Sequence, residues 1–362
     1  MMLSACSSQN ELQGEKKHLS DQEAGSEKRG KSGLANVEGS KDKELKEKAV
    51  VLSSADLERI KPDESGKIMI VMFHNFVSSF TPTKYDKGEY TTTFDDFKKL
   101  LITLYEKNYR LINMNDYLDK NVDVAAGCIP MIFTFDDGST GQFNLIKEGD
   151  KFVANKQSAV GIMEEFNKNH PDFGLKGTFY VNLGLKTFEG EGSLEQRLKY
   201  LIDKGFEIGN HTLTHVNLDK VTSSDKVIKE LGGNQKKMGE VVSGYKMKTL
   251  ALPYGGLPAK GIEQYVVRGE YDGIQYENLA LLEVGWDPAP SPVNNAFKPT
   301  SLHRVRASGI NPVETDLGWW LKNLAKSEQY VSDGNKDTIT IPKAQLKSIR
   351  EQTLGNKKLV TY

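Results

Sequence analysis

Short apolar runs alternate with amphipathic segments of helical length between Ile68 and Trp286. The runs are rich in β-branched and aromatic residues, which is typical of buried strands. In the segments between them, apolar residues recur at spacings of three and four, which indicates helices. Strands separated by such helices predict βαβ units around a parallel sheet or barrel, and therefore an α/β fold. The expected strands are residues 68–73, 109–114, 131–135, 176–183, 206–211, 248–256 and 279–286, and the expected helices are residues 93–107, 160–169, 193–205 and 224–242.

The composition agrees with a large folded body. The chain has 362 residues, of which 38% are hydrophobic, and this is enough for a sizeable core. Its formal net charge is −1, so we expect no nucleic-acid partner. No run approaches the roughly 18 apolar residues that a membrane-spanning helix needs. The two cysteines, Cys6 and Cys128, imply no disulfide framework.

The first 50 residues differ from the rest. Residues 3–6, LSAC, resemble a bacterial lipobox, in which the cysteine becomes lipid-modified, but the basic start and apolar region of a signal peptide are missing. Residues 7–50 are rich in Ser, Gly, Lys and Glu, which predicts a disordered tether. This layout favours an extracytoplasmic protein, either a bacterial surface lipoprotein or a secreted one, with membrane contact only through a lipid anchor at Cys6. The alternative is an accidental match on a frayed tail.

Two adjacent carboxylates end the apolar run at residues 131–135. The stretch reads MIFTFDDG, so Asp136 and Asp137 follow the predicted strand, and Gly138 allows a tight exit from it. In parallel α/β folds the active site lies beyond the carboxyl ends of the strands. The two aspartates are therefore candidates for such a site, although Asp-Asp-Gly is also ordinary turn chemistry.

A pair of histidines stands at the end of another predicted strand. His211 and His215 lie four residues apart in GNHTLTH. On one helical turn this spacing places both imidazoles on the same face, within reach of one cation. Because the chain has six histidines, two of them at ligand spacing in the strand-end layer indicate a metal site.

Together these residues predict two imidazole nitrogens and one carboxylate on a divalent cation. Adjacent residues of an extended segment point in opposite directions, so one aspartate can bind the metal while its neighbour acts as a base. Three protein ligands with an open position suit water activation, because the cation lowers the pKa of its bound water toward neutrality. The predicted site is therefore that of a hydrolase.

At these residues the chain resembles the polysaccharide deacetylase family, metal-dependent carbohydrate esterases with a NodB homology domain. These enzymes remove acetyl groups from chitin, peptidoglycan or xylan. Residues 134–138 match the first family motif, Thr-Phe-Asp-Asp-Gly, and residues 211–215 match the second, His-(Ser/Thr)-x-x-His. GTFYV at residues 177–181 also resembles a family strand. The resemblance covers roughly residues 68–306 and implies a distorted (β/α) barrel.

The resemblance also implies roles for the site residues. Asp137, His211 and His215 would bind the metal, with zinc as the default and cobalt or nickel suiting the same ligands. Asp136 would be the catalytic base that accepts a proton from the attacking water. The backbone N–H of Tyr254 would help to hold the resulting oxyanion.

Two later family motifs match less well. The third is Arg-x-Pro-(Tyr/Phe)-Gly, whose arginine orients the base, but here Ala251 takes the place of that arginine. Either Arg304 or Arg306 substitutes, or Asp136 is less firmly held. The fifth motif, Leu-x-His, supplies the general acid that protonates the departing amine. SLHRVRA at residues 301–307 is a shifted match, which makes His303 the candidate acid.

Four residues are expected to contact the substrate. Pro253 and Tyr254 would form a wall of the groove. Trp286 would stack on a sugar ring, although a core position is an alternative for it. His74, at the end of the first predicted strand, completes the set and rivals His303 as the acid, since some extracellular family members have a Tyr-His pair there. A hydrogen-bonded structural role is equally open for His74.

The resemblance implies a metal-dependent amide hydrolase that removes N-acetyl groups from a cell-wall or extracellular polysaccharide containing N-acetylglucosamine. One alternative is a glycan-binding module on a catalytically retired scaffold, which Ala251 and the missing Leu-x-His favour. A metal hydrolase acting on a small amide is another. We assign residues 1–50 to the tether and residues 51–324 to the catalytic domain. Residues 325–362 form a C-terminal extension packed on that domain, in which DTITIPKAQL predicts a strand and a short helix.

Overall fold

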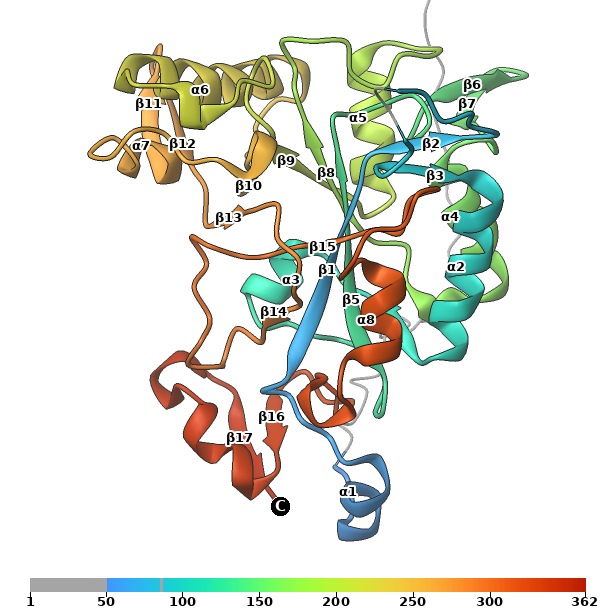
Figure 1. The fold of residues 1–362 in the computed structure, drawn as a ribbon, viewed down its shortest axis with the longest axis vertical. Helices are drawn as coiled ribbons and strands as arrows, with labels where there is room; N and C mark the ends of the chain where they lie inside the picture. The colour runs from blue at the N-terminus through green and yellow to red at the C-terminus, as the bar shows by residue number, and fades with distance from the viewer. Residues whose placement is uncertain (1–50, 85–86) are drawn as a thin grey trace, which may run out of the picture. The chain divides into compact units, whose positions relative to one another are not determined.

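The strands of the chain are short, and each of the seven expected from the sequence is present (Figure 1). The computed structural model describes residues 51–84 and 87–362, which fall within one unit of the chain, Lys48–Tyr362. The strands are β1 (Lys67–Phe73), β2 (Asn75–Val77), β3 (Thr91–Thr93), β4 (Tyr109–Leu111), β5 (Ile129–Asp136), β6 (Leu145–Glu148), β7 (Lys151–Ala154), β8 (Thr178–Val181), β9 (Glu207–Asn210), β10 (Thr249–Ala251), β11 (Arg268–Tyr271), β12 (Ile274–Glu277), β13 (Ala280–Leu282), β14 (Ala289–Pro290), β15 (Val305–Arg306), β16 (Thr338–Ile341) and β17 (Lys358–Thr361). The seven expected strands are β1, β4, β5, β8, β9, β10 and β13.

The α-helices match the four that the sequence predicts and add several short ones. Helix α5 illustrates the local signals, because Ser193 caps its start through a bond from the backbone N–H of Gln196, and Gly205 follows its end with φ +92°. The helices are α1 (Ser54–Ile60), α2 (Phe94–Glu106), α3 (Met114–Leu118), α4 (Ala159–Asn169), α5 (Leu194–Asp203), α6 (Ser224–Val241), α7 (Gln264–Val267) and α8 (Leu317–Asn323).

The main sheet is curled and almost entirely parallel. Its order is β13-β10-β9-β8-β5-β1-β14, with β4 on β5 and β15 on β1, and only β14 runs antiparallel to its neighbour. The segment before and within β15 brings the two sides of the curl together, because Val305 pairs with Val71 of β1 and Leu302 bridges Leu282 of β13. The α/β class and the distorted barrel are therefore confirmed.

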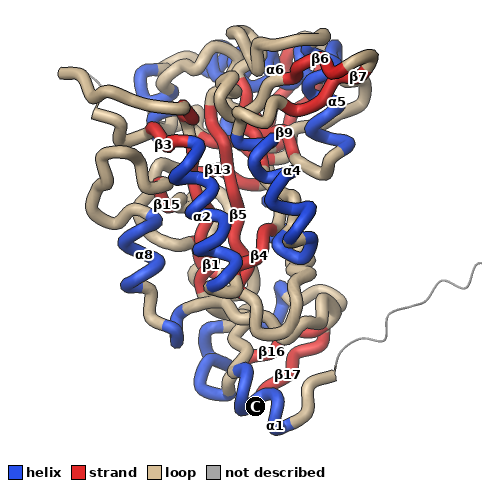
Figure 2. The backbone as a smooth tube through the Cα atoms, turned by 90° about the vertical axis from the view of Figure 1, so that its right-hand side faces the viewer, coloured by secondary structure: helices blue, strands red, loops and turns tan. Residues whose placement is uncertain are grey.

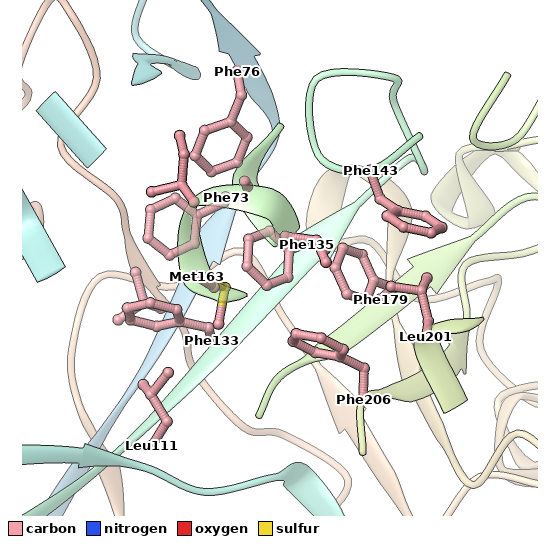
Figure 3. Close-up of a cluster of buried hydrophobic side chains, with 14 of the residues drawn as sticks. Phe73, Phe76, Leu111, Phe133, Phe135, Phe143, Met163, Phe179, Leu201 and Phe206 are labelled. Carbon is pink, nitrogen blue, oxygen red and sulfur yellow. The ribbon is translucent and has the colours of Figure 1, made fainter. Parts of the chain in front are cut away.

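The period of two along β5 divides its side chains between two environments. Phe133 and Phe135 face the helix layer, where they pack with Phe73 and Phe179 in one hydrophobic cluster (Figure 3). Helices α2 and α4 cover this side of the sheet (Figure 2). The alternate residues of β5 face the inside of the curl. Asp136 is one of these, so the strand itself carries this carboxylate into the interior.

The last part of the chain packs against the residues just before β1. Strands β16 and β17 form a parallel pair, and a 3-10 helix, Lys343–Ser348, follows β16 where the sequence predicts a short helix. The buried carboxyl group of Glu64 accepts hydrogen bonds from the backbone N–H of Thr340 at 2.8 Å and from Tyr330 Oη at 3.0 Å. These bonds tie residues 330–340 to the start of the domain.

Other sequence expectations meet the structure differently. Residues 139–159, which follow the first motif, contain the antiparallel β6–β7 hairpin, and neither this hairpin nor the β11–β12 hairpin was expected from the sequence. Cys6 and the predicted tether lie outside the described residues. Within residues 51–84 and 87–362, no helix has the length and apolar character needed to cross a membrane.

Candidate metal and catalytic site

A buried ion pair links β5 to the segment that closes the sheet. Asp136 is 1% exposed and Arg304 is fully buried. Arg304 donates two hydrogen bonds to the carboxylate, Nη1 to Oδ1 at 2.7 Å and Nη2 to Oδ2 at 2.8 Å. It also donates to Thr134 Oγ1 and to the backbone carbonyl of Glu283, each at 3.2 Å. Arg304 therefore supplies the arginine that Ala251 cannot, and Asp136 is firmly held.

This pairing determines the charge of Asp136. Burial alone would raise the pKa of the carboxyl, but the Arg304 guanidinium and the nearby imidazole of His211 hold that pKa well below its ordinary value. A carboxylate that stays ionised while shielded from solvent can accept a proton from a bound reactant. Arg306 does not take this position, because its Nη2 donates to Tyr90 Oη at 2.8 Å.

The neighbouring carboxylate meets both histidines of the second motif. Asp137 Oδ1 lies 3.5 Å from Nε2 of His211 and 3.3 Å from Nε2 of His215. One ligand atom from each residue lies within 4.8 Å of those of the other two, so among the described residues this trio is a group that could hold a metal ion. Asp136 lies next to the trio, with 4.0 Å between its Oδ2 and Nε2 of His211.

The trio fits a divalent cation. Two atoms that each lie about 2.1 Å from a tetrahedral metal are about 3.4 Å apart, close to the separations of Asp137 from the two imidazoles. The Nδ1 atom of His211 lies 2.7 Å from the carbonyl oxygen of Ala251. A proton on Nδ1 makes that bond and leaves the Nε2 lone pair free for a metal, as second-shell carbonyls do at such sites.

The histidine pair lies on a bend, and the single helical turn expected from its spacing is absent. The segment after β9 has no helical structure, and Thr212 and His215 adopt φ angles of +65° and +56°. Asp137 has φ +79°. Gly138 follows with φ +68°, and a Cβ there would lie 2.7 Å from Thr187 Cγ2, which explains the glycine. Unfavourable backbone at several site residues is typical of functional sites.

Buried amides hold this bend, and they are not among the residues expected from the sequence. Asn210 Oδ1 accepts from the backbone N–H of Thr212 and from Asn234 Nδ2, each at 2.9 Å. Asn182 Nδ2 donates to the backbone carbonyls of His211 and Thr212. Asn210 directly precedes the second motif, so the sequence offered a signal for this one of the three amides. Asn182 and Asn234 come from β8 and α6 regions far along the chain.

The two candidate acids occupy different surroundings. His74 Nε2 lies 3.9 Å from Asp136 Oδ2, and burial lowers the pKa of His74 despite the pull of that carboxylate. The Nδ1 atom of His303 lies 3.3 Å from Oδ1 of Asp287, and its Nε2 atom lies 3.7 Å from Oε2 of Glu283. Both ring nitrogens of His303 therefore lie beside carboxylates other than Asp136.

The expected substrate-contacting residues differ in exposure. The ring of Tyr254 is 67% exposed and its centroid lies 5.0 Å from that of His215, next to the metal trio. Trp286 is 63% exposed, which rules out the core position considered for it. Pro253 is buried, so it shapes the loop beneath Tyr254 and presents no open surface.

Residues 124–267 match the family model for polysaccharide deacetylases. Over these residues the chain is similar to a polysaccharide deacetylase domain. The match contains Asp136, Asp137 and both histidines of the trio, whereas His74 and Arg304 lie outside it on either side. No curated protein matches the chain.

Solved structures share the fold of the domain. A deacetylase of Streptococcus pyogenes, PplD, in complex with acetate has a TM-score of 0.52 and 17% identity, over 72% of this chain and 98% of that chain. A polysaccharide deacetylase from Bacillus cereus has a TM-score of 0.51 and 18% identity, over 72% of this chain and 69% of that one. Identities this low establish a common fold, and the resemblance to the deacetylase family is confirmed by the fold and the family model together.

Proposed function

We propose that the protein is a metal-dependent deacetylase that hydrolyses the N-acetyl groups of a polysaccharide containing N-acetylglucosamine. The observation that carries the proposal is the pairing of a complete ligand trio with a separate carboxylate. Asp137, His211 and His215 converge through three donor atoms, while Asp136 stays outside the trio, buried and ionised. A purely structural metal site has no use for that second carboxylate.

Each residue then has a chemical task. A divalent cation held by the trio, zinc or else cobalt or nickel, would polarise the acetyl carbonyl and lower the pKa of a water. Asp136, oriented by Arg304, takes the proton from the attacking water. The backbone N–H of Tyr254 donates to the oxygen that becomes negative. Water adds to the carbonyl carbon, the C–N bond breaks, and acetate and a free amine leave.

We assign the proton donor to His74. Its Nε2 is 3.9 Å from Oδ2 of the base that must hand a proton onward. The two ring nitrogens of His303 lie near the carboxylates of Asp287 and Glu283, so we assign His303 a structural role beside Trp286.

The retired-scaffold alternative loses its main support. That alternative relied on Ala251, but Arg304 makes the bidentate pair with Asp136 that the missing arginine would make. It also relied on the missing Leu-x-His, and His74 offers an imidazole near the base from another strand end.

The test is acetate release from N-acetylglucosamine oligomers and from peptidoglycan, by protein stripped of metal and then reloaded with zinc, cobalt or nickel. We expect release that requires the metal. Asp136→Asn should retain metal and lose most of the rate, because only the base is removed, whereas His211→Ala should lose metal and activity together. Tight metal binding without acetate from either substrate would contradict the proposal.

We further propose that the protein acts outside the cytoplasm, held to the membrane by a lipid on Cys6. Residues 3–6 and the polar composition of residues 7–50 support this. Cys6→Ser should move the protein from the membrane fraction to the medium, and an unchanged distribution would contradict the anchor.

A further inference from the structure

Arg306 and Tyr90 form a wall beside His74. Arg306 of β15 pairs with Met72 of β1, and His74 directly follows the end of β1. Arg306 Nη2 donates to Tyr90 Oη at 2.8 Å, and the guanidinium carbon lies 4.3 Å from the centroid of the Tyr90 ring. The Tyr90 ring meets the imidazole of His74 edge-on, with 4.8 Å between centroids and 63° between planes. Arg306, Tyr90 and His74 thus form a row of contacts that ends at Asp136.

Backbone hydrogen bonds fix both members of this wall. The N–H of Asn75, next to His74, donates to the carbonyl of Tyr90 at 3.0 Å. The N–H of Ile310 donates to the carbonyl of Thr91 at 2.9 Å, so the segment after β15 is tied to the segment that carries Tyr90. The positions of Tyr90 and Arg306 are therefore fixed by these two backbone hydrogen bonds as well as by the contact between the two side chains.

The imidazole of His74 has few restraints of its own. Its Nδ1 atom is buried and has no hydrogen-bond partner among the residues that the structure describes. By contrast, the Nδ1 atom of His211 is fixed by the carbonyl of Ala251 at 2.7 Å. The contact with Tyr90 thus takes the place, for His74, of the hydrogen bond that usually orients a functional imidazole.

We propose that Tyr90, held by Arg306, is a positioning residue that fixes the ring of His74 where it can donate a proton to the departing amine. Tyr90 is 39% exposed, so the competing role is a direct contact with the sugar. The inference rests on the proposed function, in which His74 is the donor. Misplacing a catalytic group by about 1 Å costs roughly 100-fold in rate, so loss of the ring should have a measurable effect.

The variants are Tyr90→Ala, Tyr90→Phe and Arg306→Gln, with Tyr271→Phe in the distant β11–β12 hairpin as the matched control. Tyr90→Ala should lower kcat about 10- to 100-fold with KM within about twofold. Tyr90→Phe should recover most of kcat, because the ring contact with His74 remains. Arg306→Gln should give a smaller loss in the same direction. In a His74→Ala background, Tyr90→Ala should cause no further loss, because the two residues act as a unit.

A second readout needs no turnover. In protein labelled at histidine ring carbons, Tyr90→Ala and Arg306→Gln should move the ring resonances of His74, and Tyr271→Phe should leave them in place. If the wild type released no acetate, the proposed function would fail, and these resonances would still decide the positioning. The inference is overturned if Tyr90→Ala raises KM at unchanged kcat, or if it lowers kcat in the His74→Ala background as much as it does in the wild type. It is also overturned if the His74 resonances do not move. If Tyr90→Ala does not fold, the Phe and Gln variants decide between these outcomes.

Discussion

Replacing Arg304 by methionine is the sharpest perturbation of the buried ion pair. The substitution removes two hydrogen bonds to Asp136, one to Thr134 and one to the carbonyl of Glu283. It leaves a carboxylate that is 1% exposed without its counter-charge. Removing one partner of a buried pair destabilises a protein by about 3–5 kcal/mol, and we expect the free energy of unfolding to fall by that amount near neutral pH.

The loss should depend on pH. Without the guanidinium, burial raises the pKa of Asp136, so the folded variant keeps a proton that the unfolded chain releases near its ordinary value of 3.8. The difference in stability between wild type and variant should therefore grow as the pH rises from about 4 to 7. For the same reason the residual deacetylase rate of the variant should increase with pH, because ionisation restores the base.

The assay is denaturant unfolding at several pH values, with metal content measured in parallel. Arg59→Met is the matched control, since Arg59 pairs with Asp56 at 3.0 Å but its side chain is 71% exposed. An exposed pair of this kind is screened by solvent and contributes little to stability. An Arg304→Met protein that lost no more stability than Arg59→Met would refute the reasoning that the buried pair orients Asp136.

Three further predictions follow from single groups. Burial, reinforced by nearby Asp333, raises the pKa of Glu64 to about 8, so the free energy of unfolding should fall as the pH rises from about 5 to about 8, by up to about 1.4 kcal/mol per pH unit. Glu64→Gln should flatten this dependence of the free energy of unfolding on pH. Urea unfolding at several pH values tests this, and a variant with the same pH dependence as the wild type would contradict it. His74→Ala should lower kcat for N-acetylglucosamine oligomers about 100-fold or more, whereas His303→Ala should leave kcat within a few-fold, and the reverse order would assign the acid to His303. His215→Ala should abolish zinc retention in equilibrium dialysis, and wild-type zinc content in that variant would remove His215 from the site.

The local pattern of the sequence was sufficient for the core of the fold. Apolar runs such as residues 131–135 are buried on both faces in a parallel sheet, so their composition alone indicates strands. Helix α5 likewise has its cap and its terminating glycine in the sequence. The small strands β14 and β15 could not be predicted, because each is only two residues long and exists through pairing with β1.

For the site, the sequence by itself determined the two motifs that carry Asp136, Asp137, His211 and His215, because each motif is a contiguous stretch at one strand end. The tertiary structure decided which arginine pairs with Asp136, since Arg304 and Asp136 are 168 positions apart. It also placed His74 near Asp136, and it brought Tyr90 against His74 and Arg306 against Tyr90. Such contacts depend on strand order and on the alternation of side chains across a closed curl. No local stretch of the sequence determines either of these.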